Sequence, residues 1–268
     1  MEIIIIAGSE GLLGSRLRDA FLTEQDIIVI GFDLLKDSSI ENKRYVYVTG
    51  SVTNDKDLTM LSAKIADIQR KNGILGSLKS IINCTVEADF EFPKISIPID
   101  LPEEEWALWG WKNYPSSEFA KQTNTNIVGA HQLLTKIFEQ FSKSKDCSII
   151  NFVSQYALKV PNQDLFKGFG KFIFKGPGYS ASKAGLINYT QYLATIFKGL
   201  GVRANCIAIG SIENGQNPEF IKKYSANTLL GRMMRSEEII PVVKFLSSDA
   251  SSYMSGSCIV LDGGWTIK

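Results

Sequence analysis

Short apolar runs recur along this chain, and most of them are separated by stretches with helical spacing. The first run, residues 3–7, contains only Ile and Ala, and the apolar residues of segment 12–22 recur at helical intervals. Strands that are apolar throughout suit a parallel sheet covered on both faces, and long connections suit right-handed β-α-β units. We therefore expect an α/β fold with a doubly wound parallel sheet of about seven strands and helices on both faces. The expected strands are residues 3–7, 27–32, 45–48, 80–84, 148–153, 202–208 and 258–261.

The composition is that of one globular domain with a small-molecule partner. A chain of 268 residues with 44% hydrophobic content can bury a full core, and it contains no repeat or linker, so residues 1–268 are expected to form one domain. The 29 Lys and Arg nearly cancel the 28 Asp and Glu, which leaves no basic field for nucleic acid or an anionic membrane. No apolar run reaches membrane-spanning length and no leader pattern is present, so a cytoplasmic location is expected.

Histidine and cysteine usage argues against several kinds of catalytic centre. His131 is the single histidine and lies in a helical stretch, which argues against a Ser-His-Asp triad or a multi-histidine metal site. The cysteines form no C-x-x-C pair and have no neighbouring histidine, so we expect free thiols and no metal. These cysteines are Cys84, Cys147, Cys206 and Cys258.

A glycine-rich turn follows the first expected strand and opens a helix. Gly8, Gly11 and Gly14 permit a tight turn and let the backbone approach a pyrophosphate, whose charge the helix N-terminus stabilises. Asp33 ends the second strand, where its carboxylate can accept hydrogen bonds from both adenosine ribose hydroxyls. This order predicts a Rossmann-like dinucleotide site that favours NAD(H). NADP(H) is the alternative, because Lys36 lies close enough in sequence to counter a 2′-phosphate.

A second pair of polar residues begins another expected helix. Tyr179 and Lys183 are four residues apart and therefore share one helix face. A phenol that transfers protons near neutral pH needs its phenolate form stabilised, and a nearby ammonium supplies charge of the right sign. The same spacing is common on ordinary amphipathic helices, so the assignment depends on corroborating motifs.

Those motifs resemble the short-chain dehydrogenase/reductase family along nearly the whole chain. Residues 148–154 resemble the strand that ends in the family's catalytic serine, here Ser154, and residues 126–129 resemble the helix that bears its catalytic asparagine, here Asn126. Tyr179 and Lys183 match the family's Y-x-x-x-K motif. Residues 231–232, 245–250 and 261–264 resemble the ordered C-terminal markers of the branch with about 250 residues.

The resemblance implies an NAD(P)-dependent oxidoreductase that transfers hydride between nicotinamide and an alcohol or ketone. Tyr179 would transfer the proton at the substrate oxygen and Ser154 would hydrogen-bond that oxygen. Lys183 would favour the phenolate and hold the nicotinamide ribose, and Asn126 would organise a proton-relay water. The implied catalytic residues are Asn126, Ser154, Tyr179 and Lys183. The expected cofactor-binding residues are Gly8, Gly11, Leu12, Leu13, Gly14, Asp33, Asn83, Tyr179, Lys183, Gly210 and Ile212.

Two departures from the family pattern keep other functions open. Residues 83–86 read Asn-Cys-Thr-Val where the family has Asn-Asn-Ala-Gly, so only Asn83 matches. The glycine spacing resembles the longer epimerase and dehydratase branch, although the ending resembles the simpler dehydrogenases. The alternatives are a sugar-nucleotide epimerase or dehydratase that recycles tightly held NAD, and a non-catalytic NAD-binding sensor.

Two long segments, residues 91–117 and 158–177, are expected as insertions that shape the substrate pocket, because this fold brings loops from these positions over the nicotinamide. Aromatic side chains of the first suit stacking on a sugar, loop packing or a subunit contact: Trp106, Trp109, Trp111 and Tyr114. Lysines of the second suit a phosphorylated or nucleotide-linked substrate, or a solvated surface: Lys159, Lys167, Lys171 and Lys175.

Two further expectations concern the substrate and the assembly. Residues 214–224 and 230–233 are similar to a subgroup linked to flagellin or surface-sugar modification, which suggests a sugar or sugar-nucleotide substrate. The family resemblance also implies a homodimer or homotetramer that pairs through the helices near His131 and Leu186.

Overall fold

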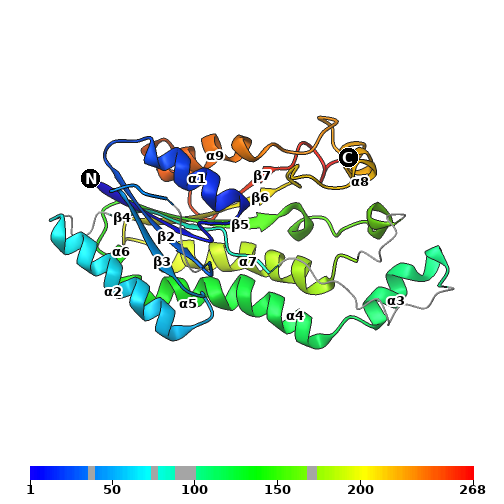
Figure 1. Cartoon of the computed structure of the whole chain (residues 1–268), viewed down its shortest axis with the longest axis horizontal. Coiled ribbons are helices and arrows are strands. Elements are labelled where there is room, and N and C mark those ends of the chain that lie inside the picture. The colour runs from blue at the N-terminus through cyan, green and yellow to red at the C-terminus, as the bar shows by residue number, and fades with distance from the viewer. Residues whose placement is uncertain (36–39, 74–77, 88–100, 168–173) are drawn as a thin grey trace.

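The computed structural model describes residues 1–35, 40–73, 78–87, 101–167 and 174–268, and these form a seven-stranded sheet with helices on both faces (Figure 1). The strand order is β3-β2-β1-β4-β5-β6-β7, and every neighbouring pair is parallel. The predicted fold is confirmed, and each expected strand overlaps an observed one. The strands are β1 (Glu2–Ala7), β2 (Ile27–Asp33), β3 (Tyr45–Thr49), β4 (Leu78–Asn83), β5 (Cys147–Ser154), β6 (Val202–Ile209) and β7 (Cys258–Leu261).

The first strand shows why the apolar runs do not alternate with polar residues. Ile3 and Ile5 pack into the core on one face of the sheet, and Ile4 and Ile6 pack into the core on the other, because successive side chains point to opposite faces. All four are fully buried. The first face is covered by α2 (Asp55–Lys71), α5 (Gly129–Lys136) and α7 (Pro177–Ile196), and the second by α1 (Leu12–Leu22) and α9 (Ile240–Ser247), as Figure 1 shows.

The other described α-helices lie beside these layers or beyond their ends. The chain stays helical from α4 through a π-helical segment, residues 124–128, into α5. Figure 1 shows α3 beyond the end of α4, away from the sheet. These helices are α3 (Trp106–Lys112), α4 (Ser116–Thr123), α6 (Phe138–Phe141) and α8 (Pro218–Ser225). Short 3-10 turns occupy Glu103–Glu105, Gln155–Ala157, Gln163–Phe166, Ser236–Ile239 and Asp249–Ser251.

Two glycines determine how closely α1 begins beside the end of β1. Gly8 has a φ of +81°, a conformation that side chains other than glycine rarely adopt. A Cβ at Gly14 would lie 1.9 Å from the carbonyl oxygen of Gly8. The first turn of the helix is therefore pressed against the turn that precedes it, and its free amides lie at the edge of the sheet.

A buried ion pair holds the middle of the same turn. Arg18 is 5% exposed, and its Nη1 lies 2.6 Å from Oε2 of Glu10. The hydroxyl of Tyr45 donates to Oε1 of Glu10 at 2.5 Å, and the guanidinium of Arg18 lies 5.5 Å from the centre of the Tyr45 ring. A buried charge needs such partners to offset its desolvation, so α1 and β3 together stabilise the glycine turn.

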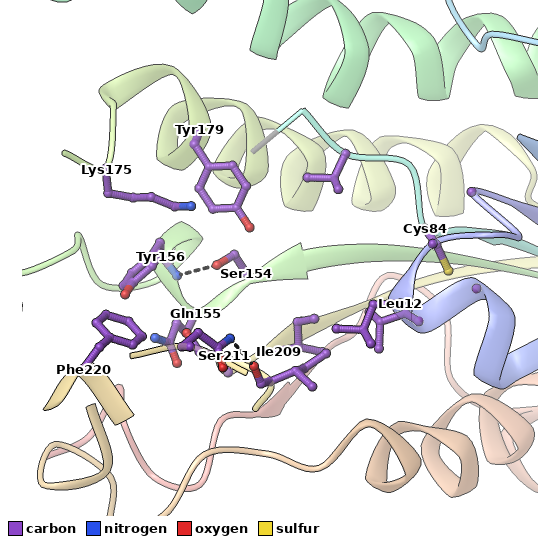
Figure 2. Close-up of a pocket in the computed structure, with 18 of the residues that line it drawn as sticks. Leu12, Cys84, Ser154, Gln155, Tyr156, Lys175, Tyr179, Ile209, Ser211 and Phe220 are labelled. Atoms are coloured by element: carbon purple, nitrogen blue, oxygen red, sulfur yellow. Dashed lines mark hydrogen bonds between the residues drawn. The ribbon is translucent and has the colours of Figure 1, made fainter. Parts of the chain in front are cut away.

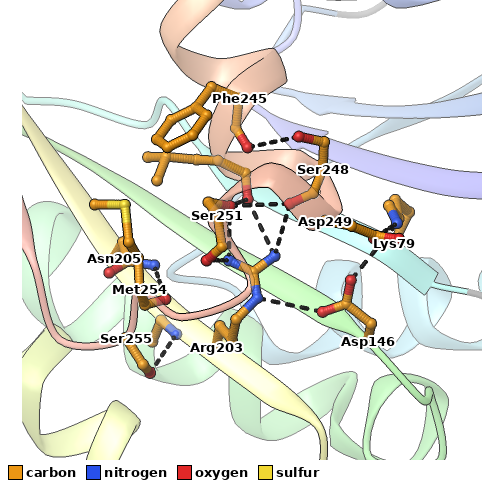
Figure 3. Close-up of polar contacts among 12 residues, drawn as sticks. Lys79, Asp146, Arg203, Asn205, Phe245, Ser248, Asp249, Ser251, Met254 and Ser255 are labelled. Carbon is orange, nitrogen blue, oxygen red and sulfur yellow. Dashed lines mark hydrogen bonds and ion pairs between the residues drawn. The ribbon is translucent and has the colours of Figure 1, made fainter.

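A second polar network lies at the opposite end of the sheet, where β4, β5 and β6 begin (Figure 3). Arg203 donates to the carbonyl and hydroxyl oxygens of Ser251 at 3.0 and 2.9 Å, and to Oδ1 of Asp146 at 3.2 Å. Nζ of Lys79 lies 3.6 Å from Oδ2 of Asp146 and 2.9 Å from Oδ1 of Asp249. These contacts connect the strand starts to the segment after α9, so this end of the molecule has a structural role.

Other expectations bear on membranes, cysteines and metals. None of the helices in the described ranges combines the length and the hydrophobicity that a membrane span requires. The four cysteines are free thiols, as predicted. His, Cys, Asp and Glu side chains of the described residues form no group suited to holding a metal ion.

Gly14→Ala tests the close approach of α1 to the turn. We expect the added methyl group to lower the free energy of unfolding by about 2–3 kcal/mol, because the Gly8 carbonyl must move. Gly11→Ala is the matched control: its φ is −71° and its Cβ would lie 3.5 Å from the same oxygen, so a change within about 0.5 kcal/mol is expected. Urea unfolding of both variants measures the difference. Equal losses would contradict this account.

Candidate active site

Two adjoining cavities lie where the strands end, at the edge where ligands of open parallel sheets bind. The large cavity, of about 490 Å³, extends from the glycine turn past Ser154 and Tyr179 to Phe220. The small cavity, of about 270 Å³, extends from the same turn to Asp33. Both are lined by Gly8, Gly11, Cys84 and Val86, so together they form one elongated site.

The start of α1 forms the junction between the two cavities. Its N-cap, Gly11, provides no side-chain hydrogen bond, and Leu12, Leu13 and Gly14 line the large cavity. The first amides of a helix have no acceptor within the helix and carry its positive dipole end. An uncapped helix start beside a glycine turn suits a phosphate group, so these residues fit the pyrophosphate of a dinucleotide.

Asp33 lines the small cavity with its carboxylate held in place. Oδ1 accepts a hydrogen bond from the amide of Leu34 at 2.7 Å, and Oδ2 accepts one from the amide of Glu10 at 2.8 Å. Among the described residues that line this cavity, the charged ones are Glu10, Asp33 and Glu87, and none is Lys or Arg. Lys36 lies outside the described residues. The described lining therefore suits ribose hydroxyls, which can donate to a carboxylate, better than it suits a 2′-phosphate.

Ser154 and Tyr179 come from different elements and line the same large cavity. Ser154 is the last residue of β5, and its Oγ accepts a hydrogen bond from the amide of Tyr156 at 3.1 Å. Tyr179 lies in the first turn of α7, with its hydroxyl directed toward Ser154 (Figure 2). Because the Ser154 oxygen accepts from the backbone, its own O–H stays available to donate into the cavity.

Lys183 follows Tyr179 by one turn of α7 and is 3% exposed. Its Nζ donates to the carbonyl oxygen of Phe152 at 2.9 Å, which ties α7 to β5. Burial disfavours the ammonium and lowers the pKa of Lys183 to about 8. Lys183 is not among the described residues that line the two cavities, so its ammonium lies beneath their surface, between α7 and β5.

Asn126 lies in the π-helical segment and is 1% exposed. Its Oδ1 accepts from the amide of Glu87 at 2.9 Å, and its Nδ2 donates to Oγ of Ser182 at 2.9 Å. The side chain therefore joins the segment after β4 to α7, one residue before Lys183. Single-turn π segments inside α-helices are frequent at functional sites.

The other expected cofactor residues take two kinds of position. Gly210 and Ile212 line the large cavity. Asn83 is buried beneath the lining, where its Oδ1 accepts from the amide and hydroxyl of Thr85 at 3.2 and 2.6 Å. Cys84, the next residue, lines both cavities, and burial raises the pKa of its thiol to about 12. Asn83 thus shapes the cavity floor through its neighbours.

The two segments that are expected as insertions contact each other. Tyr114 of the first packs on Phe174 of the second with ring centres 6.1 Å apart, and its hydroxyl donates to Oε1 of Gln122 at 2.7 Å. Within the described residues, neither Tyr114 nor the three tryptophans line the cavities, and Trp111 is 64% exposed. The sugar-stacking interpretation of these aromatic side chains therefore has no support in the described cavities.

The far end of the large cavity contains residues that were not predicted individually, although Phe166 and Phe220 lie in segments expected to bear on the substrate. Phe166 stacks on Phe220 with ring centres 5.8 Å apart, and Gln155 and Tyr156 lie beside them. These side chains come from three separate segments, and no local spacing marks them. Their position directly after Ser154 is the one signal that could have indicated Gln155 and Tyr156.

Comparison with known proteins gives matches over the whole chain. A family model described as enoyl-(acyl carrier protein) reductase matches residues 110–266. The chain is 32% identical to 3-oxoacyl-(acyl-carrier-protein) reductase FabG of Thermotoga maritima, over 99% of this chain and 98% of that protein. It is 23% identical to the post-translational flagellin modification protein A of Campylobacter coli, over 98% of each.

Two more comparisons concern length and structure. The chain spans 43% of the uncharacterized short-chain type dehydrogenase/reductase y4vI of Sinorhizobium fredii, with 24% identity over 98% of this chain. A crystal structure of a short-chain dehydrogenase from Leptospira borgpetersenii with bound NAD+ superposes with a TM-score of 0.80 and 26% identity. That match covers 99% of this chain and 92% of the other.

The buried Lys183 predicts how stability depends on pH. Unfolded lysine holds its proton up to its ordinary pKa of 10.5, whereas folded Lys183 releases it near 8. The unfolded state binds more protons between these values, so the free energy of unfolding should rise by about 3 kcal/mol as pH increases through that interval. Lys183→Met removes this contribution. Urea unfolding of both proteins at several pH values measures it, and parallel curves would contradict the assignment.

Proposed function

Because this chain belongs to the short-chain dehydrogenase/reductase family, and so is an oxidoreductase, we propose that it interconverts an alcohol and a ketone at Tyr179 with a bound nicotinamide dinucleotide. The observation that carries the proposal is the common cavity of Tyr179, Ser154 and the uncapped start of α1. In this one continuous cavity, the proton-transfer groups and the amides suited to binding a pyrophosphate lie together.

The proposed reaction divides between the cofactor and the chain. A bound nicotinamide supplies the hydride acceptor or donor. Tyr179 takes the proton from the substrate hydroxyl during oxidation and returns it to the carbonyl oxygen during reduction. Ser154 donates its O–H to the same oxygen, because its own oxygen already accepts from the amide of Tyr156.

Lys183 and Asn126 support the reacting tyrosine. One of the three N–H donors of Lys183 bonds to Phe152, and the others would hold the ribose next to the nicotinamide. Its ammonium would also stabilise the phenolate of Tyr179. Asn126 would hold α7 and the segment after β4 in register through its bonds to Ser182 and Glu87.

NAD(H) is the proposed cofactor, with NADP(H) as the alternative. The support is the carboxylate of Asp33 and the absence of Lys and Arg from the described lining of the small cavity.

A sugar or sugar nucleotide is the proposed substrate class, supported by the sequence similarity to a flagellin modification protein. A homodimer or homotetramer stays a prediction, with the exposed outer side of the π-helical segment and α7, where Val128, Tyr192 and Ile196 lie, as the surface it would use.

Tyr179→Phe tests the proposed chemistry. A panel of sugars and sugar nucleotides is offered with NAD(H), and reduced nicotinamide is followed by absorbance. We expect turnover to fall by at least about 100-fold, as for the loss of a general acid-base group, while NADH affinity stays within a factor of about two. Undiminished turnover would overturn the role of Tyr179. NADH binding without turnover of any substrate by the wild-type protein would favour the sensor.

Asp33→Ala tests the cofactor preference. Loss of the ribose hydrogen bonds should weaken NADH binding by about tenfold, because hydrogen bonds to charged groups are lost. Removing the negative charge should leave NADPH binding unchanged or stronger. Fluorescence titration of both nucleotides against both proteins gives the ratio. An equal loss for NADH and NADPH would contradict the assignment of Asp33 to the ribose.

A further inference from the structure

The far end of the large cavity has a distinct charge. Its described lining contains one charged side chain, Lys175, and no carboxylate. The other described lysines of the same insertion are directed elsewhere: Lys167 pairs with Asp164 at 2.6 Å, and Lys159 donates to the backbone oxygen of Lys268 at 2.7 Å. Lys175 is the described lysine of this insertion that lines the cavity.

The backbone of Lys175 is held in place by a distant residue. The side chain of Gln163 accepts from the Lys175 amide at 3.2 Å and donates to its carbonyl oxygen at 3.0 Å. The Nζ atom lies 4.5 Å from the centre of the Tyr179 ring, so the ammonium contacts the reacting tyrosine (Figure 2). A group bound by Lys175 would lie close to the carbon that reacts.

Two buried hydrogen-bond donors line the same end of the cavity. Gln155 is 1% exposed and Tyr156 is 5% exposed. Within the described chain, neither Nε2 of Gln155 nor the hydroxyl of Tyr156 has a hydrogen-bond partner. The orientation of the Gln155 amide is fixed, because the Tyr224 hydroxyl accepts from the Ser211 amide and so donates to Oε1 of Gln155 at 2.7 Å.

An unpaired buried donor costs free energy, which a ligand acceptor would recover. A cation with two such donors, among described lining residues that include no carboxylate, is complementary to a negatively charged oxygen group. Building on the proposed function, we propose that the substrate carries an anionic oxygen group, a carboxylate or a phosphate, which binds Lys175 with help from Gln155 and Tyr156. Lys175 is then a specificity-determining residue beside the reacting carbon.

The test uses the intact protein saturated with NADH, so that the pyrophosphate site is filled. Inorganic phosphate and acetate are the probes, each titrated by calorimetry at constant ionic strength. We expect saturable binding of at least one probe to the wild-type protein, and binding about tenfold weaker in Lys175→Met. Which probe binds distinguishes a phosphate from a carboxylate.

Two variants, and a measurement of NADH binding made before the probes are added, make the outcome decisive. Lys167→Met removes a lysine of the same insertion that does not line the cavity, and it should bind the probe within a factor of about two of wild type. Lys175→Arg keeps the charge and should retain most of the binding. Equal affinities in wild type and Lys175→Met, or no saturable binding of either probe to wild type, would overturn the inference. Failure to bind NADH would instead overturn the proposed function.

Discussion

A chain of buried hydrogen bonds fixes α7 against the centre of the sheet, and the placement of the reacting groups depends on it. Nδ2 of Asn83 on β4 donates to Oδ1 of Asn151 on β5 at 3.2 Å, and Nδ2 of Asn151 donates to Oγ1 of Thr190 on α7 at 3.0 Å. Lys183 adds its bond to Phe152. Sliding α7 along the sheet would leave these buried groups unpaired, at about 1–3 kcal/mol each. The helix therefore has one register, and Tyr179 keeps one position relative to Ser154.

The other half of the site comes from a separate unit of the fold. The strand order reverses between β1 and β4, so the helices that follow β1 and β4 lie on opposite faces and leave a crevice at the strand ends. The close contact of Gly14 with Gly8 places the start of α1 at this crevice. The Glu10–Arg18 pair makes the turn rigid without placing an uncompensated charge at the site. The amides suited to binding phosphate and the proton-transfer groups thus line one cavity.

The fold was predictable because its determinants are local. Buried strands such as residues 3–7 need apolar residues on both faces, and a helix entered through Gly8 and Gly14 needs glycine, so both leave a pattern in sequence. Tyr179 and Lys183 share one helix face for the same reason. The sequence also indicated Gly8 and Gly11 at the junction of the cavities, but not Cys84 or Val86.

The substrate end was not predictable in the same way, because distant contacts build it. Lys175 was one of four equivalent lysines in the sequence, and its bonds to Gln163 distinguish it. Gln155 is oriented by Tyr224, which is far from it in sequence. Asn83 matched a family motif yet acts beneath the lining, since its hydrogen bonds go to Thr85 and Asn151. Contacts between distant residues leave no periodic pattern in the sequence, so they cannot be inferred from it.

A crystal structure of the protein with NADH is the most direct test of the central claim, that the two cavities form one dinucleotide site. We expect the pyrophosphate on the amides that begin α1, the adenosine ribose at Asp33, and the nicotinamide beside Tyr179 and Ser154. A dinucleotide bound in the opposite direction, or outside the two cavities, would contradict it.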